Sequence, residues 1–151
     1  MTPARLHDTS IDRPEFSAGG VVVRGREVIV IVPIKRDSGG NRVLGLPKGH
    51  PDGDETAEQA AAREVSEETG VVARLVEKLG EVRYHYERRG GRVAKQVAFY
   101  LFEYVSGDVA DHDHEIEDAR WMPLEDAAAA LSYVGEREMV QRALSRLSAD
   151  R

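Results

Sequence analysis

The chain of 151 residues contains no cysteine, which excludes both a disulfide framework and a thiolate metal site. It has no apolar run near the ~20 residues of a membrane span, and residues 1–17 hold none of signal-peptide length. Asp and Glu outnumber Lys and Arg by 27 to 21, and the net charge of −6 argues against a duplex nucleic-acid binder. We therefore expect a cytoplasmic protein with no membrane, nucleic-acid or protein partner.

Composition and length indicate a globular protein with a single domain. Hydrophobic residues make up 41% of the chain and charged residues 32%, and 151 residues are enough for a substantial core. Residues 1–15 are polar and contain Pro14, so we expect a flexible N-terminal arm. Residues 16–151 should then form the domain.

Patterns of Val, Ile, Gly and helical spacing predict an α/β fold with a mixed sheet between helices. The predicted strands are two within 16–34 around a turn at residues 24–26, a short strand or extended segment at 43–46, a hairpin of 71–86 with 93–106, and 119–122. The predicted helices are 57–69, 124–132 and 136–147, with Pro123 at the start of the second. Residues 108–118 should form an acidic loop.

The helix at residues 57–69 has clear signals at both ends and carries a concentration of carboxylates. Thr56 suits an N-cap, Gln59 completes a capping box, and Gly70 stands where positive φ is wanted. Helical geometry places three glutamates within a roughly 100° sector of one face. They are Glu64, Glu67 and Glu68.

Three converging carboxylates require a cation, and an oxygen-only set suits a hard ion such as Mg²⁺ bound together with substrate phosphates. The alternative is an ordinary solvated helix face. The preceding loop, with Gly49 and Gly53, favours the metal site because it can turn sharply beside the helix.

The segment from Gly49 to Val71 resembles the signature of the Nudix hydrolases. The matching positions are Gly49, Glu55, Arg63, Glu64, Val65, Glu67, Glu68, Gly70 and Val71. The resemblance implies an α/β/α Nudix sandwich and Mg²⁺-dependent (or Mn²⁺-dependent) hydrolysis of a nucleoside diphosphate linked to another group. It also implies that Arg63 pairs with Glu55 and orients the carboxylates, and that Glu115 serves as a further metal ligand or base.

The flanking segments are similar to the asymmetrical diadenosine tetraphosphate hydrolases. The similar segments are residues 16–21, 46–50, 83–86, 95–97, 99–101 and 133–135. The chain departs from that branch at Gly45, where an aromatic is usual, and at Arg83, where histidine is frequent. The implied reaction converts diadenosine tetraphosphate to ATP and AMP. Oxidised dGTP or ADP-ribose remain alternative substrates, and a non-catalytic nucleotide sensor is a rival function.

Four residues outside the signature are candidates for binding a small nucleotide substrate. Lys48 and Lys95 are flexible point cations that suit phosphates, and Tyr84 and Tyr133 could stack on adenine. The alternatives are surface lysines and ordinary core or rim tyrosines.

The general base is open between Glu64 and Glu115, because either could reach the attacking water. Glu81 is a weaker rival for the role of Glu115. His112 and His114, two residues apart, could also share one side of an extended segment and bind a transition metal, although solvated loop histidines are the simpler interpretation.

Overall fold

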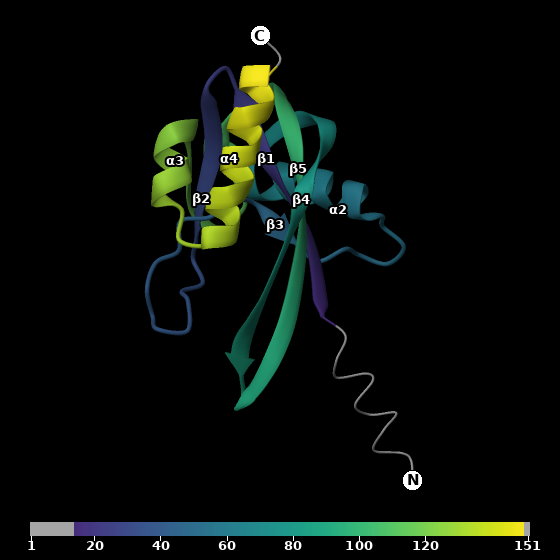
Figure 1. Cartoon of the computed structure of the whole chain (residues 1–151), viewed down its shortest axis with the longest axis vertical. Coiled ribbons are helices and arrows are strands. Elements are labelled where there is room, and N and C mark those ends of the chain that lie inside the picture. Colours follow the sequence, from purple (N-terminus) through teal and green to yellow (C-terminus); the bar gives the residue numbers. More distant parts are fainter. Residues whose placement is uncertain (1–13, 150–151) are drawn as a thin grey trace.

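The computed structural model describes residues 14–149, which form a mixed sheet with helices on both faces (Figure 1). The predicted arm at residues 1–15 lies outside the described residues except for Pro14 and Glu15, and Glu15 already begins the first strand. Within the described part, no helix is both long and apolar enough to cross a membrane.

Six strands form the described sheet in the order β4-β5-β1-β2-β6, with β3 paired to β1 off this path. Their bounds are β1 Glu15–Arg24, β2 Glu27–Pro33, β3 Lys48–Gly49, β4 Val71–Arg88, β5 Gly91–Gly107 and β6 Ile116–Pro123. Strands β1 and β5 are parallel and the other pairs are antiparallel, so the predicted mixed sheet is confirmed.

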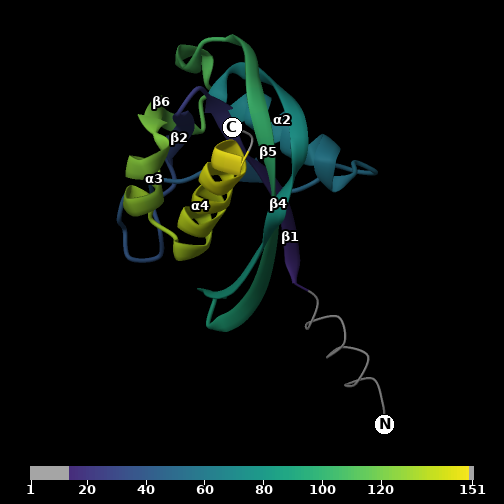
Figure 2. The same cartoon turned by 45° about the horizontal axis from the view of Figure 1, so that its top comes forward.

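Helices cover the two faces of the sheet unequally (Figure 2). Helix α2 (Ala57–Thr69) packs on one face through Ala60, Ala61 and Val65, while α3 (Leu124–Ala130) and α4 (Val134–Ala149) pack on the other. A short 3-10 helix, η1 (Val109–Asp111), precedes β6. A large apolar core results on each face, and a small third cluster of Ile31, Ile116 and Ala119 joins β2 to β6.

Helix α2 has the predicted bounds because local signals fix both ends. The Thr56 side chain accepts the Gln59 N–H, the Gln59 side chain accepts the Thr56 N–H, and Gly70 adopts φ 79° at the C-terminus. This reciprocal cap satisfies amides that would otherwise lack partners in the first turn. The carboxylates of the signature are therefore carried by a helix that begins and ends where its sequence specifies.

Residues 43–46, predicted as a short strand or extended segment, do not form a strand. Only Gly45 pairs there, with Ile31 of β2, and the strand is Lys48–Gly49 instead. Strands β1 and β2 pair with each other only beside their turn. Farther from the turn, residues 45–49 lie between the two strands, and the Gly20 N–H donates to the Pro47 carbonyl at 3.1 Å. This nonlocal insertion brings β3 into the sheet beside α2.

Other boundaries also differ from the predictions. Strand β6 begins at Ile116 within the predicted loop, because it pairs with β2 along most of its length. Pro123 ends this strand and precedes α3, which stops at Ala130. Helix α4 begins at Val134, two residues early, because the Glu136 N–H already bonds to the Tyr133 carbonyl.

The predicted hairpin is confirmed as β4 and β5, which turn at Arg89 and Gly90. Its far end projects beyond the helices (Figure 1). Tyr84 pairs with Lys95, which pairs in turn with Glu15 at the start of β1. Within the described residues, the hairpin beyond this row has only two strands.

Candidate active site

The carboxylate of Glu64 lies directly against the backbone of β3. A Cβ atom at Gly49 would overlap with this carboxylate, so a side chain at that position would displace it. The Glu64 side chain is only 13% exposed, and burial raises its pKa above the usual range. The glycine of the signature thus makes room for a carboxylate of α2 beside the inserted strand.

Arg63 holds the loop and the helix together, and its predicted pair with Glu55 is present. The guanidinium donates through Nε and Nη2 to the two oxygens of Glu55, at 2.8 and 2.9 Å. Nη1 lies 3.1 Å from both Glu64 Oε2 and Glu67 Oε1, and Nη2 donates to the His50 carbonyl at 2.9 Å. Arg63 therefore positions two of the glutamates, and its guanidinium has no N–H group left to bind a substrate.

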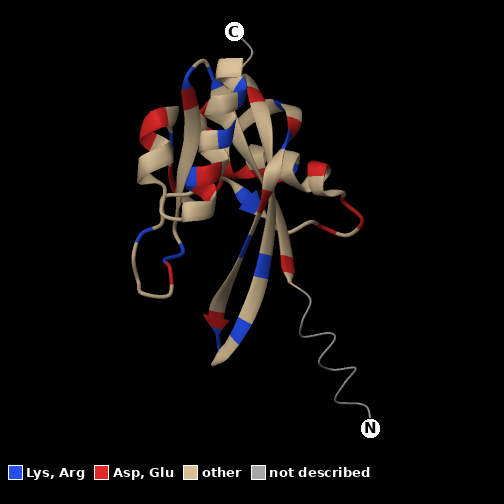
Figure 3. Ribbon diagram, in the orientation of Figure 1, with Lys and Arg blue, Asp and Glu red and all other residues tan. Residues whose placement is uncertain are grey.

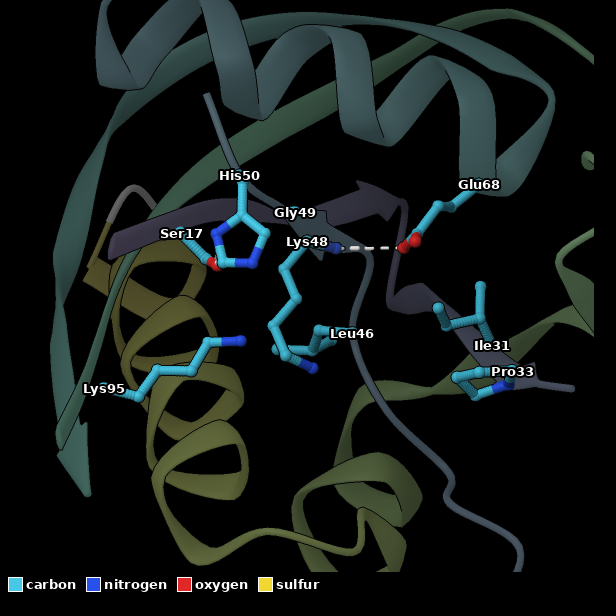
Figure 4. A pocket seen from close by; sticks show the side chains of 9 residues that line it. All are labelled: Ser17, Ile31, Pro33, Leu46, Lys48, Gly49, His50, Glu68 and Lys95. Atoms are coloured by element: carbon cyan, nitrogen blue, oxygen red, sulfur yellow. Dashed lines mark hydrogen bonds between the residues drawn. The ribbon is translucent and has the colours of Figure 1, made fainter. Parts of the chain in front are cut away.

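Glu68 faces the inserted strand from the end of α2. Its Oε1 accepts the Lys48 backbone N–H at 3.0 Å (Figure 4). Burial is the main cause that raises the pKa of Glu68 to about 8, and the nearby charge of Glu64 raises it further. In the absence of a cation, this carboxyl therefore favours its protonated form at neutral pH.

The expected convergence of the three carboxylates is not complete. Among residues 14–149, no three His, Cys, Asp or Glu side chains are close enough to hold one metal ion. The physical reason is that Arg63 attracts Glu64 and Glu67, whereas Glu68 turns toward the β3 amide.

The residues nevertheless fit a divalent cation such as Mg²⁺ or Mn²⁺. The donors are carboxylate oxygens, which these ions prefer, and burial disfavours the charged forms of Glu64 and Glu68. A cation would offset that cost. When bound, such an ion supplies charge neutralisation at phosphate oxygens and a more acidic water molecule.

The raised pKa of Glu68 predicts a pH-dependent stability for the metal-free protein. Because the pKa rises from 4.5 to about 8 on folding, the stabilising effect of the protonated form is present below 4.5 and lost as pH increases through 8. In EDTA, the melting temperature of Glu68→Gln should exceed that of the wild type by a margin that grows from about pH 5 to about pH 9. Thermal denaturation measures this margin, and a constant difference would contradict the shift.

A cavity of about 240 Å³ opens beside Glu68 (Figure 4). Its lining residues are Ser17, Ile31, Pro33, Leu46, Lys48, Gly49, His50, Glu68 and Lys95. Lys95 extends from β5 into this space, and burial together with the charge of Lys48 lowers its pKa. Its position agrees with the predicted phosphate contact.

Lys48 lines the same cavity but is not a free cation. Its Nζ donates to Glu136 Oε2 at 2.8 Å, and the two side chains are 20% and 4% exposed. Glu136, which lies on the buried face of α4 with Met139 and Ala143, was not among the predicted site residues. The sequence signal that could have identified Glu136 was a charged residue at an otherwise apolar position of this helix.

Tyr84 and Tyr133 come together from β4 and the start of α4. Their ring centroids are 6.3 Å apart with an angle of 15° between the planes, and Lys48 Nζ lies 5.8 Å from the Tyr133 centroid. Tyr133 is 40% exposed. The two predicted stacking residues thus form one aromatic pair beside the lysines.

A NUDIX domain model matches residues 14–143. The chain belongs to the Nudix hydrolase family. Members of this family act on pyrophosphate bonds and generally use divalent cations, commonly Mg²⁺. The predicted Nudix fold is therefore confirmed.

Two relatives are identical to this chain at more than a third of the aligned positions. The chain is 39% identical over 132 residues to the putative mutator protein MutT4 of Mycobacterium tuberculosis (strain CDC 1551 / Oshkosh), covering 84% of this chain and 53% of the relative. It is 36% identical over 101 residues to the 8-oxo-(d)GTP phosphatase of Mycolicibacterium smegmatis, covering 67% and 30%. The chain thus spans about half of the first relative's length and less than a third of the second's.

Solved Nudix structures share the architecture. A NUDIX hydrolase from Nitrosomonas europaea superposes with a TM-score of 0.71 at 21% identity, covering 88% of this chain and 90% of that one. A binary complex of the C. elegans Ap4A hydrolase gives 0.66 at 22%, covering 89% and 98%. These similarities establish the fold.

The 108–118 segment packs against the end of α2, where the Asp113 N–H donates to the Glu67 carbonyl at 3.0 Å, but its candidate residues do not line this cavity. Glu115 and His114 line a second, more open depression with Ile34 and Lys35. The His112 Nδ1 lies 2.9 Å from the Asp113 carbonyl, and no metal-holding group of three side chains occurs in the described part. Within the described residues, His112 and His114 therefore have no third side chain with which to hold a metal ion, and the role of Glu115 as a ligand or base stays a prediction.

Glu81, the weaker candidate, is bound by its neighbours on the hairpin. Its oxygens accept from Lys78 Nζ at 2.6 Å and Gln96 Nε2 at 2.5 Å. These bonds hold the carboxylate at the sheet surface.

Proposed function

We propose that this protein hydrolyses a pyrophosphate bond in a nucleoside polyphosphate with the aid of Mg²⁺ or Mn²⁺. One observation carries the proposal: a single cavity is lined both by Glu68, a carboxylate of the family signature, and by Lys48 and Lys95. A polyphosphate needs cations along its length and a metal at the bond that breaks. The cavity offers both to one ligand.

In this proposal Glu64, Glu67 and Glu68 hold the metal, and Arg63 keeps the first two in place. Lys95 binds a phosphate oxygen, and Lys48 does so while paired with Glu136. Glu64 is favoured over Glu115 as the base that takes the proton of the attacking water, because it lies against Gly49 at the cavity wall. A complete set of carboxylates argues against the nucleotide-sensor alternative.

The first candidate substrate is diadenosine tetraphosphate. The paired rings of Tyr84 and Tyr133 offer an aromatic platform for a purine, and the lysines continue from it toward the carboxylates. The flanking segments resemble the asymmetrical branch, which implies cleavage to ATP and AMP. This candidate requires a long phosphate chain to span the cavity.

The second candidate is an oxidised purine nucleoside triphosphate such as oxidised dGTP. Its support is the 39% and 36% identity to relatives named as a putative mutator protein and an 8-oxo-(d)GTP phosphatase. The same platform and lysines would serve a single purine with three phosphates.

Product analysis distinguishes these candidates. With diadenosine tetraphosphate, oxidised dGTP, ADP-ribose and diphosphoinositol phosphates as a panel, we expect the highest kcat/KM for diadenosine tetraphosphate. The products should be ATP and AMP, and ¹⁸O from labelled water should appear on AMP. Two equivalents of ADP would contradict asymmetrical cleavage, and a higher kcat/KM for oxidised dGTP would establish the second candidate.

A further inference from the structure

Glu136 is a buried carboxylate that contacts three parts of the site. It lies in the first turn of α4 and is only 3% exposed. Its Oε1 accepts the Leu46 N–H at 2.9 Å, and its Oε2 accepts Lys48 Nζ at 2.8 Å. Its own N–H donates to the Tyr133 carbonyl at 3.1 Å. One residue thus links the segment entering β3, the cavity lysine and the aromatic pair.

The charge of Glu136 is not needed for packing alone. A neutral amide could accept the Leu46 N–H equally well, and apolar residues often replace a buried ion pair without loss of stability. A buried carboxylate is retained at a cost in desolvation, which the nearby ammonium of Lys48 offsets. The negative charge of Glu136 is therefore needed to hold Lys48 in a fixed position.

Both ends of this ion pair are confined by the surrounding backbone and rings. A Cβ atom at Gly45 would lie 3.2 Å from Glu136 Oε1, so the carboxylate packs closely on the chain there. Lys48 Nζ lies 5.8 Å from the Tyr133 ring centroid. A free lysine would distribute its ammonium among many rotamers, whereas this one is held between the platform and the cavity.

We propose that Glu136 is a positioning residue, which holds Lys48 Nζ so that the phosphate chain is bound in a fixed register with the base on Tyr133. The inference rests on the proposed function, because Lys48 must contact substrate phosphate. Glu136 itself has no contact with the reacting atoms. It acts through the lysine.

Replacing Glu136 with glutamine separates the charge from the hydrogen bond to Leu46. We expect kcat to fall about tenfold because a misplaced phosphate reacts slowly, with KM unchanged or lower because a negative charge near a polyanion is removed. The melting temperature should fall, because the buried Lys48 ammonium loses its ion-pair partner, so kcat is measured at a temperature at which the variant is folded. Glu138→Gln, an exposed substitution on the same helix, is the matched control and should leave kcat and KM unchanged.

Two further measurements test whether Glu136 acts through Lys48. In a Lys48→Met background, Glu136→Gln should cause no further loss of kcat/KM, because coupled residues are not additive. In ¹⁵N-labelled protein without nucleotide, the Lys48 ammonium should give a slowly exchanging signal that is lost in Glu136→Gln. If that variant does not fold, Glu136→Asp should give the same fall in kcat, because the shorter side chain withdraws the charge from Lys48.

An unchanged kcat in Glu136→Gln would overturn the inference, as would an additional loss in the Lys48→Met background. Failure of the wild type to cleave any nucleotide would instead refute the proposed function. In that case the ammonium signal still reports whether Glu136 holds Lys48. The two failures are therefore distinguishable.

Discussion

Replacing Glu68 with glutamine is expected to lower kcat about 1,000-fold, equivalent to roughly 4 kcal/mol of transition-state stabilisation. The substitution removes one carboxylate from the set that would hold the divalent ion. The glutamine oxygen can still accept the Lys48 N–H, so the contact between α2 and β3 should survive. Steady-state kinetics at saturating Mg²⁺ measures the loss, and circular dichroism checks that the fold is retained.

The matched control is Glu58→Gln, which changes an exposed glutamate in the first turn of the same helix. This variant should keep near-wild-type turnover, whereas EDTA should abolish turnover in all variants. If Glu68→Gln retained near-wild-type kcat, Glu68 could not be a metal ligand.

Removal of either tyrosine ring is expected to weaken substrate binding strongly. Stacking on an aromatic is worth ~1–3 kcal/mol per base, so Tyr84→Ala or Tyr133→Ala should raise KM about 5- to 150-fold, with a smaller fall in kcat. The two rings already lie nearly parallel with centroids 6.3 Å apart, so each alanine variant also removes the partner of the other ring. Initial-rate measurements over a range of diadenosine tetraphosphate concentrations give both constants.

Phenylalanine at the same positions separates stacking from hydrogen bonding. Tyr84→Phe and Tyr133→Phe keep the ring face, so their KM should stay near that of the wild type if stacking is the interaction. A large rise in KM for the phenylalanine variants would assign the role to the hydroxyl. Unchanged KM and melting temperature in both alanine variants would show that the tyrosines are ordinary surface residues.

Local signals made the helix of the signature predictable from the sequence. The capping box at Thr56 and Gln59 and the positive φ at Gly70 act within a few residues, so the sequence alone determines both ends of α2. The β4–β5 hairpin was predictable for the same reason, since its turn at Arg89 and Gly90 joins adjacent runs.

Features that depend on distant segments could not be predicted in this way. The insertion of residues 45–49 between β1 and β2 is set by partners such as Ile31 and Gly20, far away in the chain. The pairing of Lys48 with Glu136 likewise joins residues 88 positions apart. Helical spacing predicted that the three glutamates of the signature share one face, but it could not show that Arg63 would bind Glu64 and Glu67 while Glu68 accepts the Lys48 N–H.

The projecting end of the β4–β5 hairpin should be less stable than the part of the hairpin that lies beside the site. Beyond the row formed by Tyr84, Lys95 and Glu15, the described hairpin has no third strand, and a two-stranded ribbon is only marginally stable alone. Local opening should therefore begin at Gly90 and proceed toward the body. The proposed base platform and Lys95, the proposed phosphate contact, lie where this fraying meets the rigid sheet, so a bound nucleotide would protect the hairpin amides from exchange by bridging the two regions.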